Sequence, residues 1–539
     1  MLLTGPFPVS LRLLTFSVLM ASFAALPAPA QAEDLKDALT SVYETNPRLL
    51  AERARLREID ESYVQARAQG RPTIGGTGSI SQSWVNFPGA AGVFTGLPED
   101  IGQDINISGR PNEMGVQIVQ PIYQGGRVKA LKSQAKLGIL AARENLRAQE
   151  TAQFLSAANA YVDVRRDIET IRVRRNNVRV LSRQVEAATA RFDVGAGTRT
   201  DIAQSQARLA VAEAGLAQAE AQLAVSESRY IRVVGQKPVS LSPPPVFVLP
   251  ASLPAAISAA RENNPQLIAA YFNEAAGRSA IDVAKAAGRP TVSLSAGLSR
   301  QREQLSQLQS IDAASISAQV TIPIYSGGAN TSRRRQAEHA KTRLAFETRD
   351  AELAIDQNIS EIWAQLTAAK ALLSASKRQV EAAEVAFEGV SLEQSVGNRD
   401  QLDVLNAEQE TLNAQLSVLD AERNVNAATF QLLAAMGVFD ADGINLSVTR
   451  DDPNRNLDAI RYQGLTEQVD KFAPGFIKRL DRKLPGDAKK PVDWDEAKPH
   501  LIQTEPVNPA SEPPYNPLLD ADRDGKNDDS YRSGDSPVD

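Results

Sequence analysis

The sequence predicts a mostly α-helical chain with a small transmembrane β part, arranged as a tandem structural repeat of helix, strand, strand, long helix and helix. Three observations lead to this prediction. Short motifs recur in the same order in both halves of the chain, two very long stretches contain no proline, and short segments before those stretches alternate polar and apolar residues. Alternation with a period of two is typical of a strand, and a long uninterrupted stretch with helical periodicity is typical of a helix.

The composition argues against an enzyme. The 539 residues contain no cysteine and two histidines, His339 and His500, which excludes disulfides, thiol catalysis and Cys/His zinc or iron–sulfur sites. Neither histidine lies in a setting typical of a Ser-His-Asp triad. The 59 Lys and Arg residues against 65 Asp and Glu residues give a net charge of −6, which argues against a general nucleic-acid surface. We therefore expect no catalysis and no cofactor.

Residues 1–32 have the pattern of a secretory signal peptide. Arg12 precedes an apolar run from Leu13 to Leu26, and Ala30-Gln31-Ala32 is a small-x-small cleavage pattern, so the mature chain is expected to begin at Glu33. Prolines directly after the run argue against the alternative, a core helix. No cysteine follows the cleavage site, so we expect no lipoprotein-type anchor. Beyond residue 32 no apolar run is long enough for a membrane helix.

Two tandem copies follow the signal peptide. The matching motifs are Asn46-Pro47 and Asn264-Pro265, Gly70–Thr73 and Gly288–Thr291, Pro121–Tyr123 and Pro323–Tyr325, Val194-Gly195 and Val396-Gly397, Asp201 and Asp403, and Gly235 and Gly437. The first two pairs share one offset and the others share a second, so one insertion separates the copies. We therefore divide the chain into a first repeat (33–235), a linker (236–252), a second repeat (253–437), a short segment (438–448) and a polar tail (449–539).

Each repeat is expected to open with one helix and continue with two strands. The opening helices cover 34–69 and 253–287, and a Gly-Arg-Pro sequence ends each of them. In the second repeat, 291–299 and 316–325 alternate polar and apolar residues, and the first repeat has the same alternation through 114–122. We expect long polar loops between the paired strands, at 87–111 and 300–314.

A long helix and a return helix complete each repeat. The long helices are expected over 126–193 and from 328 to about 395, and Gly195 and Gly397 mark the turns. In the first return helix, 200–234, apolar residues recur every seven positions, which favours a left-handed coiled coil. The members of this series are Ile202, Leu209, Leu216 and Leu223. The prolines at 243–245 and the segment 438–448 predict a non-helical belt between the repeats.

Four strands of about 9–11 residues have the length that crosses a bilayer when tilted. One side of these strands is apolar and the other is polar, as expected between lipid and water. Four strands cannot close a barrel, and open strand edges are not tolerated in lipid. We therefore expect several chains to close the sheet, three of them giving twelve strands around a polar lumen. The helices would continue this pore as a periplasmic tunnel.

The order of these motifs resembles the TolC family of outer-membrane efflux proteins. The resemblance rests on the Pro-Ile-Tyr-x-Gly-Gly junctions, on the turn Ser395–Arg399 and on the following segment Leu402–Ala407, and it covers about 34–445. It implies a homotrimer with a 12-stranded barrel and an α-helical coiled-coil tunnel. It also implies type I secretion or multidrug efflux of proteins or small toxic molecules. The implied partners are a periplasmic adaptor (membrane fusion) protein and an inner-membrane ABC or proton-driven transporter.

The resemblance also places a gate and selectivity site beside the two turn glycines. Asp403 matches an acidic ring position, and Asn406 falls where the family often has a second aspartate, so this ring is expected to be weaker here. Arg399 matches a position that ties one protomer to its neighbour, with Thr200 and Asp201 as its expected partners. A ring of like charges attracts cations where it narrows. The alternative is a solvated surface turn.

Two other classes of protein stay open at this stage. A periplasmic coiled-coil adaptor without a pore, or a structural spacer, would account for the helices but not for four alternating strands. In the tail, Asp520, Asp522, Asp524 and Asp528 with an intervening glycine match the start of a calcium loop, whereas Tyr531 stands where such a loop has a bidentate glutamate. The alternative is a solvated, disordered acidic tail.

Overall fold

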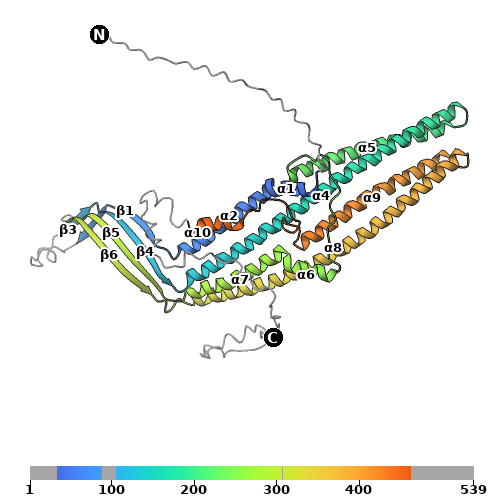
Figure 1. The fold of residues 1–539 in the computed structure, drawn as a ribbon. Coiled ribbons are helices and arrows are strands. Elements are labelled where there is room, and N and C mark those ends of the chain that lie inside the picture. Colours follow the sequence, from blue (N-terminus) through green and yellow to red (C-terminus); the bar gives the residue numbers. More distant parts are fainter. Residues whose placement is uncertain (1–32, 88–104, 306–307, 463–539) are drawn as a thin grey trace, which may run out of the picture. The chain divides into compact units, whose positions relative to one another are not determined.

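The computed structural model describes residues 33–87, 105–305 and 308–462. The predicted signal peptide and the candidate calcium loop at 520–528 lie outside these residues. The same order of elements occurs twice (Figure 1). The helices are α1 (Leu35–Thr45), α2 (Pro47–Ala68), α4 (Arg127–Asp193), α5 (Arg199–Val234), α6 (Leu253–Asn263), α7 (Pro265–Ala286), α8 (Ala329–Ser395), α9 (Gln401–Ala435) and α10 (Pro453–Tyr462). The strands are β1 (Thr73–Ile80), β2 (Ser83–Phe87), β3 (Ile105–Gly109), β4 (Asn112–Gln124), β5 (Thr291–Leu305) and β6 (Leu308–Thr321).

Each opening stretch is two helices rather than the single helix that we predicted. The break falls at the repeated Asn-Pro pair, where Asn46 and Asn264 have extended backbone angles and each caps the following helix through its side-chain oxygen. Proline is favoured at the first turn of a helix but cannot continue one, which explains the break. The Nδ2 of Asn46 also donates to the Val233 carbonyl at 2.9 Å, so the break holds the end of α5 in place.

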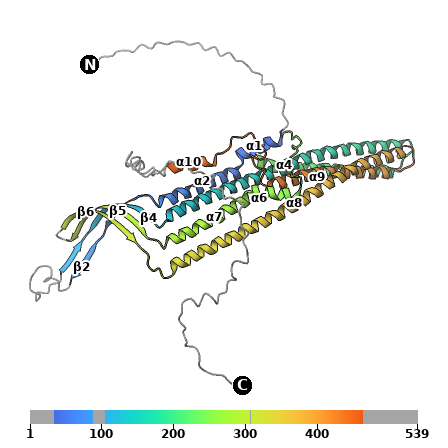
Figure 2. The ribbon, with the colours of Figure 1, turned by 60° about the horizontal axis from the view of Figure 1, so that its bottom comes forward.

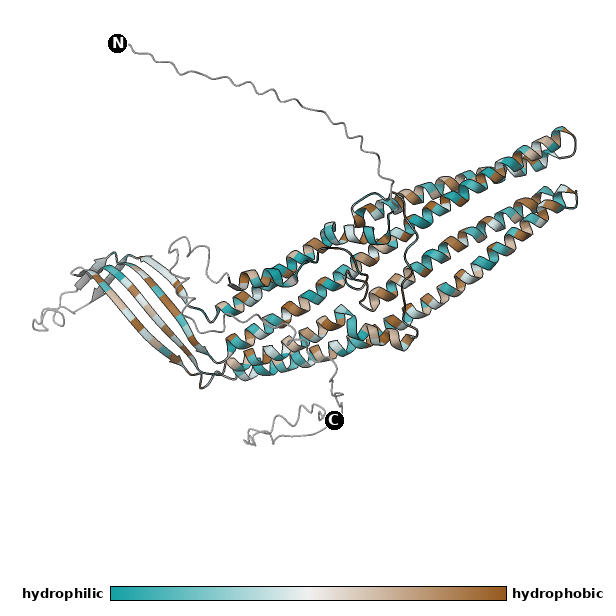
Figure 3. Ribbon diagram, viewed as in Figure 1, coloured by the Kyte–Doolittle hydropathy of each residue, from teal (hydrophilic) through white to brown (hydrophobic). Residues whose placement is uncertain are grey.

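Four strands form one antiparallel sheet in the order β1-β4-β5-β6, so β4 and β5 join the two repeats. The hydropathy colours alternate along the ribbon of these strands between brown for apolar residues and teal or white for the others (Figure 3). The apolar face includes exposed side chains on three strands, namely Met114, Val116, Ile118, Leu294, Leu298, Ile316 and Val320. In the described residues, β1 and β6 have no further strand beside them, so the sheet of one chain has two free edges.

The strands are longer than predicted, and the loop expected at 300–314 is mostly strand. The ladder continues to the pair Arg302 and Ser310, and the guanidinium of Arg300 lies 2.6 Å from the Asp312 carboxylate directly opposite. Opposite charges at facing positions stabilise a strand pair even where the apolar alternation stops. In the first repeat, β3 likewise lies within the segment expected to be a loop and pairs with β2.

The long helices agree with the prediction. Helices α4 and α8 have 67 residues each, and both follow a glycine with a positive φ, Gly126 (87°) or Gly328 (80°). Helix α4 packs between α2 and α7, and α7 packs against α8 (Figures 1 and 2). No helix among the described residues combines the length and apolarity needed to cross a membrane.

The buried positions of α5 differ from the predicted seam. The predicted series, which includes Leu209 and Leu216, is only half-buried, whereas a second series with the same spacing of seven is buried. Small side chains let two helices approach closely, which explains why this series faces α4. The buried series contains Ser205, Ala219, Ser226 and Val233.

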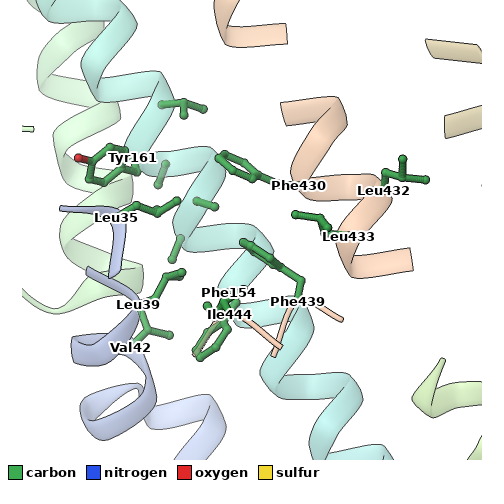
Figure 4. Packing of buried hydrophobic residues seen from close by; sticks show 14 of the residues in the cluster. Leu35, Leu39, Val42, Phe154, Tyr161, Phe430, Leu432, Leu433, Phe439 and Ile444 are labelled. Atoms are coloured by element: carbon green, nitrogen blue, oxygen red, sulfur yellow. The ribbon is translucent and has the colours of Figure 1, made fainter. Parts of the chain in front are cut away.

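The largest apolar core joins both repeats at the non-helical belt. Phe439 of the segment 438–448 is fully buried and contacts Phe430 of α9 in a stacked arrangement, with ring centroids 5.7 Å apart. The ring of Phe154 in α4 packs edge-on against the Phe439 ring, with the ring centroids 6.4 Å apart (Figure 4). In the linker, Ser242 accepts a hydrogen bond from the Tyr161 hydroxyl at 2.7 Å through its carbonyl. The core therefore fixes both non-helical segments against α4.

The tail begins with a helix, which corrects the prediction that structure ends at about residue 449. Helix α10 packs on α2, where Leu457 is buried and Asn456 Nδ2 donates to Asp60 Oδ2 at 2.8 Å. Burial raises the pKa of the Asp60 carboxyl, and the bond from Asn456 opposes that effect. The helix is too short for its periodicity to stand out in a charged, proline-rich sequence, and its partner is more than 390 positions away. Residues 463–539 lie outside the described part.

Candidate gate at the helical hairpin turns

Both long helices end in a glycine turn at the end opposite to the sheet from which they start. Gly195 and Gly397 have φ angles of 78° and 84°, a conformation that L side chains rarely adopt. The N–H of Ala196 donates to the Arg191 carbonyl at 2.8 Å, and the N–H of Asn398 donates to the Glu393 carbonyl at 2.9 Å. These bonds satisfy the last carbonyls of α4 and α8, so each turn is a defined helix end.

Asp201 caps the start of α5. Its Oδ2 accepts hydrogen bonds from the backbone N–H and the hydroxyl of Thr198, both at 2.9 Å, and Thr198 Oγ1 accepts from the Asp201 N–H at 3.2 Å. This reciprocal arrangement is a capping box. Thr200, the other residue predicted here, is exposed and forms no described side-chain hydrogen bond. The structure therefore assigns Asp201 a local role within its own turn.

Asp403 occupies the equivalent position in the second repeat but has a different contact. The cap of α9 is Asp400, whose Oδ1 accepts from the Asp403 N–H at 2.9 Å. The Asp403 carboxylate therefore remains available, and its Oδ2 lies 3.6 Å from Arg399 Nη1. Arg399 Nε also donates to Glu393 Oε2 at 2.9 Å, and this bond raises the pKa of the guanidinium.

Within one chain, Arg399 contacts residues of its own hairpin. The structure brings it to Glu393 and Asp403 and does not bring it to Thr200 or Asp201. Its expected contact with a neighbouring protomer stays a prediction. Solvent screens exposed ion pairs of this kind, so they add little stability.

Asn406 joins the two hairpins. Its Oδ1 accepts a hydrogen bond from Arg208 Nη2 of α5 at 2.9 Å. Arg208 was not among the predicted site residues. The position where the resemblance led us to expect an aspartate therefore holds an amide bound to a guanidinium, and the local charge is more positive than a second carboxylate would make it.

A second connection centres on Gln401, the first residue of α9, which is only 6% exposed at a turn whose other residues are mostly in solvent. Its Oε1 accepts from Arg191 Nη2 at 2.5 Å and from Gln394 Nε2 at 3.2 Å. Its Nε2 donates to Gln184 Oε1 at 3.2 Å. One amide therefore links α4, α8 and α9.

The contact continues away from the turns. Asn177 Nδ2 of α4 donates to Glu408 Oε1 of α9 at 3.0 Å, and burial raises the pKa of this carboxyl while the bond lowers it. These polar residues recur every seven positions on both helices, 177, 184 and 191 on α4 and 401 and 408 on α9. A seven-residue repeat of polar side chains is the sequence signal for this interface, and it differs from the apolar repeat that usually marks packed helices.

The described residues contain no group of three His, Asp or Glu side chains arranged to hold a metal ion. The candidate calcium loop, Asp520, Asp522, Asp524 and Asp528, lies outside the described residues. The hairpin turns thus offer charged and amide side chains that can hold helices together and attract ions, and nothing in them forms a catalytic arrangement.

Comparisons with known proteins agree in pointing to one family. A model of the outer membrane efflux protein family matches residues 38–236 and 256–438. The chain is 32% identical over 461 residues to the outer membrane efflux protein BepC of Brucella suis biovar 1 (strain 1330), a match that covers 84% of this chain and 96% of BepC. It is 23% identical over 433 residues to the outer membrane protein TolC of Vibrio cholerae serotype O1, which covers 77% of this chain and 93% of that protein.

The fold is also similar to solved structures. The outer membrane protein VceC from Vibrio cholerae superposes with a TM-score of 0.61 at 21% sequence identity, covering 75% of this chain and 96% of VceC. At this identity the likeness concerns the fold alone.

Proposed function

The chain belongs to the outer membrane efflux protein family, and from this premise we propose that three copies form an outer-membrane channel continued by a periplasmic tunnel. In the trimer, three four-stranded sheets close a 12-stranded barrel, and the helical hairpins line the tunnel. The channel exports proteins or small toxic molecules out of the cell. It works with a periplasmic adaptor and an inner-membrane ABC or proton-driven transporter.

The observation that carries this proposal is the sheet. Its free edges are β1 and β6, and its apolar face is exposed in one chain. Unpaired backbone groups and apolar side chains exposed to water are both unfavourable. Closing the sheet with further copies pairs the edge strands, and a bilayer covers the apolar face. Each sheet edge leads directly into the helices of a repeat, so closure of the barrel also brings the helices into a ring.

An adaptor or a structural spacer does not need such a sheet. The assembly is tested by electrophoresis of outer-membrane fractions before and after heating. The proposal predicts a band at the mass of a trimer that resists SDS and converts to monomer on heating. A soluble monomer in the periplasmic fraction contradicts the channel and favours the alternatives.

We further propose that the hairpin turns close the tunnel. In a trimer, Asp403 forms a ring of three carboxylates, and Arg399 and Asp201 hold neighbouring hairpins in place. Asp403→Ala is expected to lower cation selectivity, and Arg399→Ala is expected to raise single-channel conductance. For Asp201, the variant Asp201→Asn removes the charge and keeps an oxygen for Thr198, which separates gating from helix capping.

The matched control for these variants is Asp350→Ala, an exposed carboxylate of α8 with no described ion pair. Unchanged conductance and selectivity in all three gate variants refute the gate assignment and leave the channel in place. Relatives are named for efflux and for protease secretion, so the names alone leave two classes of transported molecule. The gene for the inner-membrane transporter that neighbours the gene for this chain distinguishes them. An ABC transporter with an adaptor indicates protein secretion, and a proton-driven pump indicates drug efflux.

A further inference from the structure

Cationic side chains gather where the sheet ends and the long helices begin. Helix α4 starts three residues after β4 and has five cations and no acid before Glu144. Helix α8 starts soon after β6 and has five cations and one acid, Glu338, in residues 329–343. We call six of these side chains the basic collar: Arg127, Lys129, Lys132, Arg333, Arg335 and Lys341.

The collar has no carboxylate partner among the residues that the structure describes. Among the described side chains, none of its six members forms an ion pair with a carboxylate, and Arg333 donates only to the Asn330 amide oxygen at 3.2 Å. Two neighbouring arginines on α8 do have such partners. Arg334 lies 3.5 Å from Glu338, and Arg343 pairs with Glu347 at 2.5 Å. The collar therefore retains most of its positive charge.

Local helix stability does not explain this charge. The N-terminus of a helix carries partial positive charge, so acids are favoured in the first turn and cations are not. Three helices that start elsewhere follow this rule, with Asp37 in α1, Asp201 in α5 and Asp403 in α9, whereas α2, α6 and α7 have no acid in their first turn. Helices α4 and α8 have no acid in the first turn, and α4 has Arg127 and Lys129 there instead. Arg127 and Lys129 therefore lie where the N-terminus of α4 itself disfavours cations, so an interaction outside the helix is needed to favour them.

The residues just before the collar have the order expected at a lipid–water boundary. Ile122 and Ile324 are exposed apolar side chains at the end of the strands, and each is followed by an exposed tyrosine, Tyr123 or Tyr325. Tyrosines are enriched at the level of lipid headgroups. The helices follow within a few residues, at about 1.5 Å per residue. The first cation of α4, Arg127, follows Tyr123 by only four residues and therefore lies close to that level, where surface charge still acts on the protein.

We propose that the basic collar binds the phosphate groups of anionic phospholipids in the periplasmic leaflet of the outer membrane. This inference rests on the proposed function, because it requires the sheet to span that membrane. Cations beside a membrane segment attract anionic headgroups, and the attraction weakens as salt rises. The bound lipid then fixes the depth of the barrel, and its phosphate groups neutralise the cations that the N-terminus of α4 disfavours.

The test uses the purified mature chain as a trimer in neutral detergent. Phosphatidylglycerol and phosphatidylcholine are titrated separately, and bound lipid is counted by native mass spectrometry. The collar variant carries Arg127→Gln, Lys129→Gln, Arg333→Gln and Arg335→Gln. The control carries four equal changes at exposed cations far from the sheet that form no described ion pair: Arg183→Gln, Arg229→Gln, Lys370→Gln and Arg378→Gln.

The wild type and the control are expected to prefer phosphatidylglycerol, and the collar variant is expected to lose about tenfold or more in affinity for it while binding phosphatidylcholine unchanged. Equal phosphatidylglycerol affinity in the collar variant and wild type overturns the proposal. So does a collar variant that changes only the ion selectivity of the channel, because the collar would then face the lumen. Absence of conductance in the wild type contradicts the proposed function instead.

Discussion

Glu150 is predicted to make the attachment of the belt segment 438–448 depend on pH. Its Oε1 accepts a hydrogen bond from the Ala441 N–H at 2.6 Å. Burial raises the pKa of this carboxyl from 4.5 to about 7, and the nearby Asp440 carboxylate adds to the rise, while the Ala441 bond and the charges of Arg53 and Arg450 oppose it. Between pH 4.5 and about 7, Glu150 is therefore protonated while the segment 438–448 is attached and ionised once the segment opens.

The sign and size of the effect follow from this difference. Because the folded pKa lies above the unfolded one, stability is greatest below pH 4.5 and is lost as the pH rises to about 7. The shift is about 2.5 units at about 1.4 kcal/mol per unit, so roughly 3 kcal/mol of stabilisation is lost over that interval. Glu150→Gln keeps an oxygen for Ala441 and cannot ionise, so it should abolish this loss.

Hydrogen exchange measured by mass spectrometry gives the opening free energy of 438–448 after correction for intrinsic exchange rates. At pH 8 the variant should be more protected than wild type by up to about 3 kcal/mol, and at pH 4.5 the two should agree. Glu186→Gln, an exposed residue of the same helix, is the control and should behave as wild type. Equal pH dependence in wild type and Glu150→Gln would refute the reasoning.

Three further substitutions test other contacts. Gln401→Ala removes the amide that links α4, α8 and α9, so the closed channel should leak more current, whereas Gln409→Ala, whose amide donates to Asn413 of the same helix, should not change it. Gly437→Ala would place a Cβ 2.3 Å from the Asn263 carbonyl oxygen and should abolish the heat-sensitive trimer. Gly195→Ala, where a Cβ meets nothing within 4 Å, should cost only about 1–2 kcal/mol and keep the trimer. Phe439→Ala removes a fully buried ring and should lower the free energy of unfolding by about 3–5 kcal/mol in urea titrations; a loss below 1 kcal/mol would contradict the belt core.

The long helices and their turns were predictable because their signals are local. Proline is absent, and glycines stand where the backbone needs a positive φ, as at Gly195 and Gly397. The repeat pattern also located both strand-to-helix junctions, since Gly126 and Gly328 precede the long helices in both copies. These features depend only on neighbouring residues in the sequence, so the sequence shows them directly.

The errors concern features that depend on distant partners. The outer halves of β5 and β6 are polar and look like a loop, but facing residues such as Arg300 and Asp312 pair them. Helix α10 forms against α2, and its short sequence does not reveal that partner. The Asn-Pro break is different, because an asparagine cap followed by a proline is a local signal for a helix start that the sequence already contained.

The geometry of the candidate gate was predicted in part. The sequence located the two turns and the charged residues beside them, because glycine and aspartate recur in both repeats. It missed Gln401 and Arg208, since amides and arginines on a helix surface are usually solvated, and only the neighbouring hairpin makes them contacts. The sequence prediction also placed Asp201 in a gate and overlooked its role in a capping box. The spacing Thr198-x-x-Asp201 already indicates that capping box.

Single-channel recording of the purified trimer in planar bilayers tests the central claim most directly. If three chains close a barrel and a tunnel, the SDS-resistant trimer should insert and give discrete, cation-selective current steps that Arg399→Ala enlarges. An intact trimer that inserts and carries no current, or a chain that is recovered only as a soluble monomer, would contradict the account.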